Sequence, residues 1–161
     1  MLTWQLTLGE TVLRLGMAVL LGGMLGLERE AMRKAAGLRT HMMVSLGAAA
    51  FTLVTFEIFE AVMGMMDQTR SDPIRIVEGV IGGVGFLGAG TIIRSRGSLE
   101  GVTTASSIWV VGAVGLSCGA GYFHVAAIIT GLAIVIISGI GRLQDRFFPD
   151  SRKKASPSRE D

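Results

Sequence analysis

The sequence has little of what catalysis and disulfide chemistry use. Among its 161 residues are one cysteine, Cys118, and two histidines, His41 and His124. A lone thiol cannot form an internal disulfide, and we interpret Cys118 as a small packing residue. The chain carries no GxSxG, HExxH, Walker or CxxC motif. We therefore expect a protein that is not an enzyme and needs no cofactor, and a metal site is left unassigned.

Charge is also scarce. Fifteen basic and 13 acidic residues give a formal net charge of +2, which predicts no nucleic-acid partner. Gly101 to Gly141 contains no Asp, Glu, Lys or Arg, and the mean hydropathy of the chain is +0.55. Apolar runs this long exceed the needs of a soluble domain, and because they do not alternate they exclude an outer-membrane barrel. The expected fold class is all-α, a polytopic protein in a lipid bilayer.

The apolar runs predict five transmembrane helices in one membrane domain, residues 1–141. A helix rises ~1.5 Å per residue, so ~20 residues cross a hydrocarbon core of ~30 Å. The expected spans are at about residues 11–27, 40–56, 74–93, 101–118 and 122–140. Residues 142–161 are expected to form a basic, partly disordered tail.

Basic residues orient the predicted spans. One side of the membrane would hold Arg29, Arg33, Lys34, Arg39, Arg94, Arg96, Arg142, Arg146, Arg152, Lys153, Lys154 and Arg159. The opposite side would hold only Arg70 and Arg75. By the positive-inside rule, the N-terminus is expected outside and the C-terminus in the cytoplasm.

The third predicted span contains the charges that bear most on function. Asp72 precedes Pro73, which is typical of a helix start. Arg75 and Glu78 follow within the first turns, and Glu78 shares a helix face with Gly82 and Gly85. We expect Glu78 to point into protein, where a carboxylate is a functional candidate. Alternatively, Arg75 and Glu78 only neutralise each other, although burying such a pair costs desolvation.

Glycines mark expected helix contacts. Small residues spaced by three or four positions let membrane helices approach closely. The first span carries such a pair, and the third span is rich in glycine. Packing is expected at Gly22, Gly26, Gly82, Gly85, Gly88 and Gly90.

Four predicted spans have polar inner ends, which would converge at the cytoplasmic mouth of a bundle. The candidates there are Glu28, Arg29, Glu30, Arg39, Thr40, His41, Thr103 and Thr104. Charges and hydroxyls at helix ends also serve as interface anchors and caps. We favour plain anchoring for Arg33, Lys34, Arg94 and Arg96.

Three blocks of sequence resemble the bacterial MgtC/SapB membrane protein family. They are Gly26 to Ala49 (GLEREAMRKAAGLRTHMMVSLGAA), Asp72 to Ile92 (DPIRIVEGVIGGVGFLGAGTI) and Arg96 to Tyr122 (RGSLEGVTTASSIWVVGAVGLSCGAGY). The resemblance implies a multi-pass protein of the inner (cytoplasmic) membrane with about five spans. It also implies a link to growth in low magnesium and, in pathogens, to survival inside host cells. Carried over by position, the motif residues are Glu28, Arg29, Glu30, Arg39, Thr40, His41, Asp72, Arg75, Thr103 and Thr104.

The sequence also departs from that family. The resemblance implies a soluble C-terminal domain in longer members; we expect this chain to be a short form without it, and functions of that domain are not transferred. Met32-Arg33 and Ala35 stand where members often have Arg-Gly and Pro. Ser45 stands where some members have cysteine, which excludes a thiol role at that position.

Two functions are consistent with these observations. The first is a non-catalytic protein of magnesium homeostasis or stress adaptation, which would bind membrane protein partners through its glycine-rich faces and form a homo-oligomer. The alternative is a small channel or carrier for a cation or solute, with Glu78 and Arg75 along the path. An internal carboxylate favours transport, whereas the lack of further intramembrane charges favours partner binding.

Overall fold

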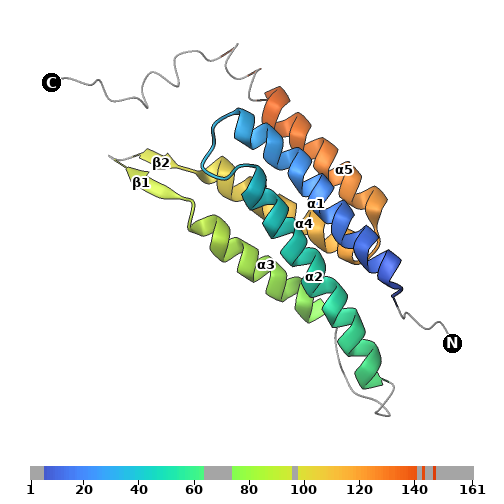
Figure 1. Cartoon of the computed structure of the whole chain (residues 1–161). Helices are drawn as coiled ribbons and strands as arrows, with labels where there is room; N and C mark the ends of the chain where they lie inside the picture. Colours follow the sequence, from blue (N-terminus) through green and yellow to red (C-terminus); the bar gives the residue numbers. More distant parts are fainter. Residues whose placement is uncertain (1–5, 64–73, 96–97, 141–142, 144–146, 148–161) are drawn as a thin grey trace.

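The computed structural model describes residues 6–63, 74–95, 98–140, 143 and 147. Their main elements are the helices α1 (Leu8–Ala31), α2 (Leu38–Met63), α3 (Ile74–Ala89), α4 (Val102–Gly119) and α5 (Phe123–Ile134). The last helix continues as a π-helical segment, η1 (Val135–Ile140). Between α3 and α4, strand β1 (Ile93–Ser95) pairs antiparallel with β2 (Ser98–Glu100). The helices form one bundle in which α4 contacts each of the other four (Figure 1).

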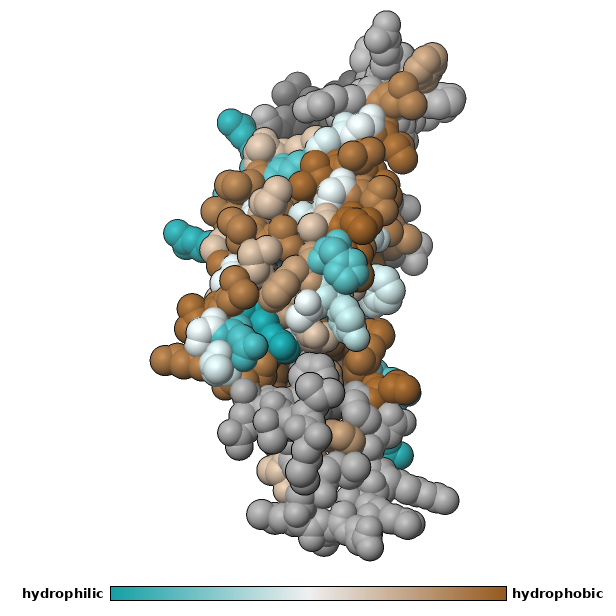
Figure 2. All heavy atoms as spheres, turned by 90° about the vertical axis from the view of Figure 1, so that its right-hand side faces the viewer, coloured by the Kyte–Doolittle hydropathy of each residue, from teal (hydrophilic) through white to brown (hydrophobic). Residues whose placement is uncertain are grey.

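Four helical segments are long and apolar enough to span a membrane. They are Leu8–Ala31, Leu38–Phe59, Val102–Gly119 and Phe123–Ile140. Large apolar side chains such as Leu20 and Ile128 are exposed, and brown hydrophobic atoms cover most of the described surface in Figure 2. These surfaces suit lipid contact, so the expected α-helical membrane protein is confirmed.

The third predicted span differs from the structure. Helix α3 ends at Ala89 rather than near Ile93, because the chain turns at Gly90 and Thr91 and then enters the hairpin. Its 16 residues rise only ~24 Å, less than a ~30 Å hydrocarbon core. The hairpin was not predicted. Five crossings and the orientation of the termini remain predictions.

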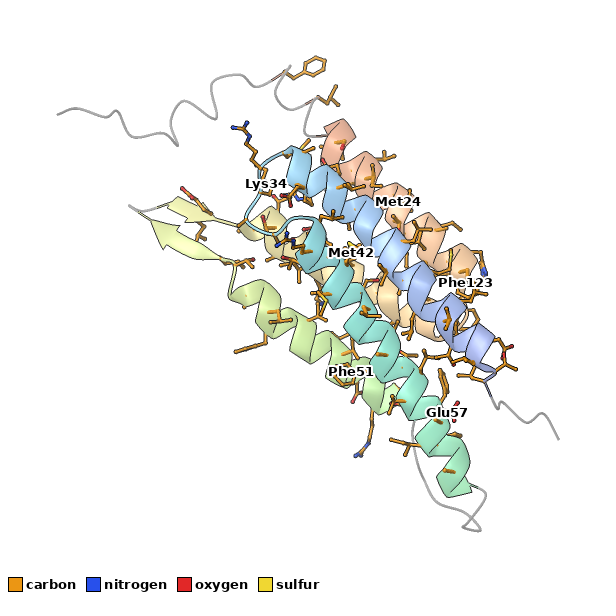
Figure 3. All side chains as sticks on the ribbon, viewed as in Figure 1. Met24, Lys34, Met42, Phe51, Glu57 and Phe123 are labelled. Atoms are coloured by element: carbon orange, nitrogen blue, oxygen red, sulfur yellow. The ribbon has the colours of Figure 1, made fainter. Side chains whose placement is uncertain are left out.

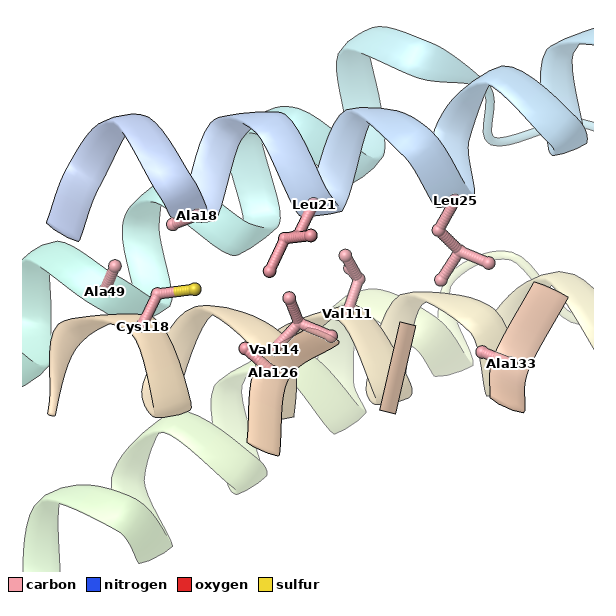
Figure 4. Close-up of a cluster of buried hydrophobic side chains, with 9 residues drawn as sticks. All are labelled: Ala18, Leu21, Leu25, Ala49, Val111, Val114, Cys118, Ala126 and Ala133. Atoms are coloured by element: carbon pink, nitrogen blue, oxygen red, sulfur yellow. The ribbon is translucent and has the colours of Figure 1, made fainter. Parts of the chain in front are cut away.

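The main apolar core lies where α1, α4 and α5 meet. Figure 4 shows side chains from these helices pointing toward one another, with Ala49 of α2 at the edge. Cys118 is fully buried in this cluster, as a packing residue would be. A second cluster joins Val80 and Val84 of α3 to Ala48 of α2 and Ile108 of α4. Helix α3 is therefore attached to the bundle by one face.

Glycines on α1 allow close contact with α2. A Cβ added at Gly22 would lie 2.6 Å from Cβ of Ser45. One added at Gly26 would lie 2.8 Å from Cα of Leu38. Real Cβ atoms do not pack this closely, so both positions need glycine to keep the two backbones at this distance.

A second close contact joins α2 to α4. An added Cβ at Gly115 would lie 2.8 Å from Cβ of Ala48, and one at Gly119 would lie 2.7 Å from the carbonyl oxygen of Ala49. Gly115 and Gly119 are not among the predicted packing positions, although they have the same four-residue spacing as the pair on α1.

The glycines of α3 behave differently from expectation. No described atom lies within 4 Å of a Cβ added at Gly82 or Gly85, so their predicted packing is wrong for a single chain. Gly88 does pack, because its added Cβ would lie 3.2 Å from the carbonyl oxygen of Ala105 on α4. Gly90 meets only its own turn, 3.3 Å from the carbonyl oxygen of Leu87.

Candidate functional site

A group of buried and half-buried polar side chains lies at the end of the bundle near the hairpin. The C-terminal end of α1, the N-terminal ends of α2 and α4 and the end of η1 meet there (Figure 1). We call this group the polar cluster, and it comprises Glu28, Arg29, His41, Ser45, Thr104, Ser107 and Ser138. The structure thus brings together four of the predicted candidates with three serines that were not predicted.

Arg29 is the most deeply buried charge among the described residues, with 1% of its surface exposed. Its Nη1 lies 3.8 Å from Oε2 of Glu28, which is an ion pair but too long for a hydrogen bond. Its Nε and Nη2 atoms find no hydrogen-bond acceptor among the described residues. Burying a guanidinium with unused donors is costly, so stability alone does not explain this arginine.

Glu28 connects α1 to the far end of the chain. Its Oε1 accepts a hydrogen bond of 2.9 Å from the hydroxyl of Ser138 in η1. Its Oε2 faces Arg29 but is buried without a hydrogen bond from any described group. The sequence could not indicate the Ser138 contact, because the two residues are 110 positions apart.

His41 is fully buried and uses both ring nitrogens. Nδ1 lies 2.8 Å from the carbonyl oxygen of Gly37, so this nitrogen carries the proton and donates it. Nε2 lies 3.1 Å from Oγ of Ser107, and that hydroxyl also lies 2.8 Å from the carbonyl oxygen of Thr104. A single hydroxyl proton therefore serves two acceptors, and the charges of Arg29 and Glu28 are close enough to act on the ring.

Ser45 lies one helical turn beyond His41, beside Gly22 of α1. Its hydroxyl is buried, and no described atom forms a hydrogen bond with it. Together with Arg29 and Glu28 it leaves both donors and acceptors unused. Groups of this kind suit a small polar ligand such as water, which needs two to four polar partners when buried.

The remaining candidates do not join the polar cluster. Glu30 is exposed, and its Oε2 accepts a 3.0 Å bond from the backbone N–H of Leu38, so it caps the start of α2. The exposed candidates without such a role are Arg39, Thr40, Arg75 and Thr103. Asp72 lies outside the described residues.

The expected inward direction of Glu78 is wrong for a single chain. Glu78 is exposed, while the residues of α3 that meet the bundle are Val80, Val84 and Gly88. At ~100° per residue, Glu78 lies ~200° around the helix from Val80. Small residues predict the packed face of a membrane helix, but here two valines form it and Gly82 lies on the outer side.

The described side chains offer no evident site for a metal ion. Among the described residues, no group of three or more His, Cys, Asp and Glu side chains could hold a metal ion. Within the polar cluster, the guanidinium of Arg29 would repel a bound cation.

The chain is similar to proteins of one bacterial family. The MgtC family model matches residues 15–146. A putative magnesium transporter, YhiD of Escherichia coli strain K12, is 40% identical over 115 residues, which are 71% of this chain and 53% of that protein. Protein MgtC of Brucella abortus strain 2308 is 37% identical over 135 residues, 84% of this chain and 52% of the relative.

The chain spans about half the length of these curated relatives. No solved structure matches it. The family match nevertheless runs from Leu15 within α1 to beyond the end of α5 and η1, and so includes every residue of the polar cluster. From this match and from relatives of 37–40% identity, we conclude that the chain belongs to the MgtC family.

Proposed function

We propose that this protein is a non-catalytic, multi-pass protein of the bacterial inner membrane that acts in magnesium homeostasis or stress adaptation by binding membrane partners. Membership of the MgtC family and the name of the YhiD relative support the link to magnesium. In this proposal the N-terminus lies outside and the polar cluster lies at the cytoplasmic end, as the positive-inside rule predicts.

The observation that carries the proposal is the outer face of α3. Arg75, Glu78 and Gly82 are exposed on the single chain, on the side of α3 away from the valines that hold it to the bundle, and half-buried Gly85 lies at the edge of this face. Charged side chains facing lipid are costly, and glycines leave room for a neighbouring helix. A partner helix, from another protein or a second copy of this chain, would cover both features.

The polar cluster supports this role indirectly. Its contacts from Glu28 to Ser138 and from His41 to Ser107 join α1 to η1 and α2 to α4. Helix α3 packs on α2 and α4. Fixing those two helices would therefore fix how the outer face of α3 is presented to a partner.

A pair of glycine variants tests the proposal. Gly82→Leu places a bulky side chain on the outer face of α3, where an added Cβ has no described atom within 4 Å apart from those of its own helix turn. Gly131→Leu is the matched control, because Gly131 on α5 is equally open. We expect Gly82→Leu, but not Gly131→Leu, to lower cross-linking to membrane partners or to a second copy, and to weaken growth in low magnesium. Equal cross-linking and equal growth of the two variants would contradict the proposal.

Transport is the second candidate function. The name of the YhiD relative favours it, and Glu78 would line a path if the outer faces of several copies of α3 enclosed one. Purified protein in liposomes, assayed for Mg²⁺ and proton flux with and without Glu78→Gln, separates the two functions. We expect no flux. If flux is observed and Glu78→Gln abolishes it, transport would be the function and the partner-binding proposal would be rejected.

A further inference from the structure

An apolar groove of about 550 Å³ runs between α2 and α3. One wall is a row of α2 residues spaced by four, and the other is a matching row on α3. Phe51 lies between the two helices in Figure 3. The rows comprise Met43, Gly47 and Phe51 on α2 and Gly79, Gly83 and Leu87 on α3.

The groove exists because glycines line it on both sides. No described atom lies within 4 Å of a Cβ added at Gly47, Gly79 or Gly83. Valines of α3 and Ala48 of α2 close the inner side of the groove. This face of α3 is separate from its outer face with Glu78 and Gly82, so the groove does not depend on the partner proposed above.

The length and volume of the groove indicate what kind of molecule could fill it. From Met43 to Thr55 the α2 wall runs 12 residues, about 18 Å, which is little more than half of a ~30 Å hydrocarbon core. Spread over that length, the volume gives a mean cross-section of about 30 Å², so a helix of ~10 Å diameter would rest on the opening without filling the groove, whereas a thin hydrocarbon chain can enter it. An apolar wall offers water nothing to bind. A single extended hydrocarbon chain fits the length, the volume and the chemistry.

A charge stands at one end of the groove. Arg39 precedes Met43 by one helical turn in the same row of α2, and it is exposed. Side chains of a helix lean toward its N-terminus, so Arg39 extends beyond the groove toward the membrane surface. Its guanidinium can pair with a phosphate there through two parallel hydrogen bonds.

We propose that the groove between α2 and α3 binds one acyl chain of an anionic phospholipid of the bilayer, with the lipid phosphate on Arg39. The acyl chain fills the space left by Gly47 and Gly83 and covers the side of α3 that the bundle leaves open. Arg39 then has a role as a lipid-binding residue, beyond that of a general interface anchor.

The test uses the full chain in nanodiscs that contain phosphatidylglycerol with a photoactivatable acyl chain, or phosphatidylcholine with the same chain. Labelled peptides are identified by mass spectrometry. We expect phosphatidylglycerol to label the α2 segment around Met43 and Phe51. Gly47→Leu fills the groove and should reduce this labelling about tenfold. Gly16→Leu, at an equally open glycine of α1, should leave it unchanged.

Arg39→Gln tests the headgroup contact. It should lower phosphatidylglycerol labelling about fivefold and leave phosphatidylcholine labelling unchanged. If Gly47→Leu fails to fold, Gly83→Leu narrows the groove from the α3 wall. Labelling that is equal on the Gly16 face, or that survives both groove variants, would overturn the proposal. Cross-links between two copies at Met43 without lipid labelling would also overturn it and assign the groove to a second chain.

Discussion

At the scale of single residues, Arg29 poses the clearest energetic problem. A fully buried guanidinium with two unused nitrogens, paired only at 3.8 Å, is not an efficient way to stabilise a helix bundle. Removing one partner of a buried pair is usually far more harmful than replacing both partners by apolar side chains of similar volume. Single and double substitutions of this pair should therefore differ in their effect on stability.

We expect Glu28→Ala to lower the free energy of unfolding by about 3 kcal/mol, because it leaves the Arg29 charge buried and removes the bond from Ser138. Arg29→Met leaves the Glu28 carboxylate buried without its ion-pair partner and should also destabilise. The double variant Glu28→Leu/Arg29→Met removes both charges and should lose less stability than the two single variants together. Denaturant unfolding of the three variants in the same detergent measures this, and losses that simply add would contradict the expectation.

Growth of cells in low magnesium tests whether Arg29 acts in function. An Arg29→Met protein that folds but no longer supports this growth would show that Arg29 is needed for function rather than for folding. Arg33→Met is the matched control, because Arg33 is exposed. Normal growth of cells that carry Arg29→Met would show that the polar cluster is not the functional site.

Part of the polar cluster could be predicted from the sequence. Glu28, Arg29 and His41 could be named because charges beside apolar runs are conspicuous in a sequence. The partners of Ser107 and Ser138 could not be named, because a serine in a membrane helix usually bonds to its own backbone, as Ser117 does with Ala113. Only the approach of another helix brings His41 to Ser107 and Glu28 to Ser138.

At the scale of elements, the end of α1 carries local strain. Arg33 has φ 52°, in the left-handed region where glycine is favoured. The N–H of Lys34 bonds the carbonyl of Arg29 at 3.1 Å, and that of Arg33 bonds the carbonyl of Glu30 at 2.9 Å. This is the Schellman arrangement, in which the residue after the cap is usually glycine.

Arg33→Gly should raise the free energy of unfolding by about 1 kcal/mol, because glycine adopts this conformation without the Cβ penalty. The matched change is Gly121→Ala after α4, where φ is 84° and Tyr122 N–H bonds the carbonyl of Ser117 at 2.8 Å. It should destabilise by a similar amount. Thermal unfolding of both variants checks the pair, and a destabilised Arg33→Gly would contradict this reading.

Both local sequence and contacts between helices stabilise the first turns of α1. Thr7 and Glu10 form a capping box at α1, which their spacing encodes. Arg14 instead donates a 2.9 Å hydrogen bond to the carbonyl of Gly119 at the end of α4. That contact joins residues 105 positions apart, so it depends on the bundle and not on the neighbouring sequence.

At the scale of the whole molecule, α4 holds the bundle together through its glycines. An added Cβ at Gly115 would collide with the carbonyl oxygen of Ser45 on α2. Gly115→Ala should therefore lower the free energy of unfolding by about 2 kcal/mol through overpacking. Gly131→Ala, on the open side of α5, should change it little. Unfolding in detergent compares the two, and equal stability would mean that α2 and α4 separate without cost.

The sequence by itself determined the class of the molecule. Long apolar runs with few charges leave no other way to satisfy the backbone than helices in a bilayer. The same runs placed α1, α2, α4 and α5 closely, because length and hydrophobicity are local properties. The end of α3 was less certain, since the glycines of this segment are compatible with both a helix and a turn.

Only the tertiary structure decided which faces are buried. The glycines of α1 and α4 lie in helix contacts, while Gly82 and Gly85 of α3 lie on the surface. The sequence pattern is similar in both cases, because a small residue permits close approach without requiring it. Whether a partner fills the space depends on where the other helices pack. The packing of the other helices also explains why Glu78 lies on the outside and Arg29 lies within the polar cluster.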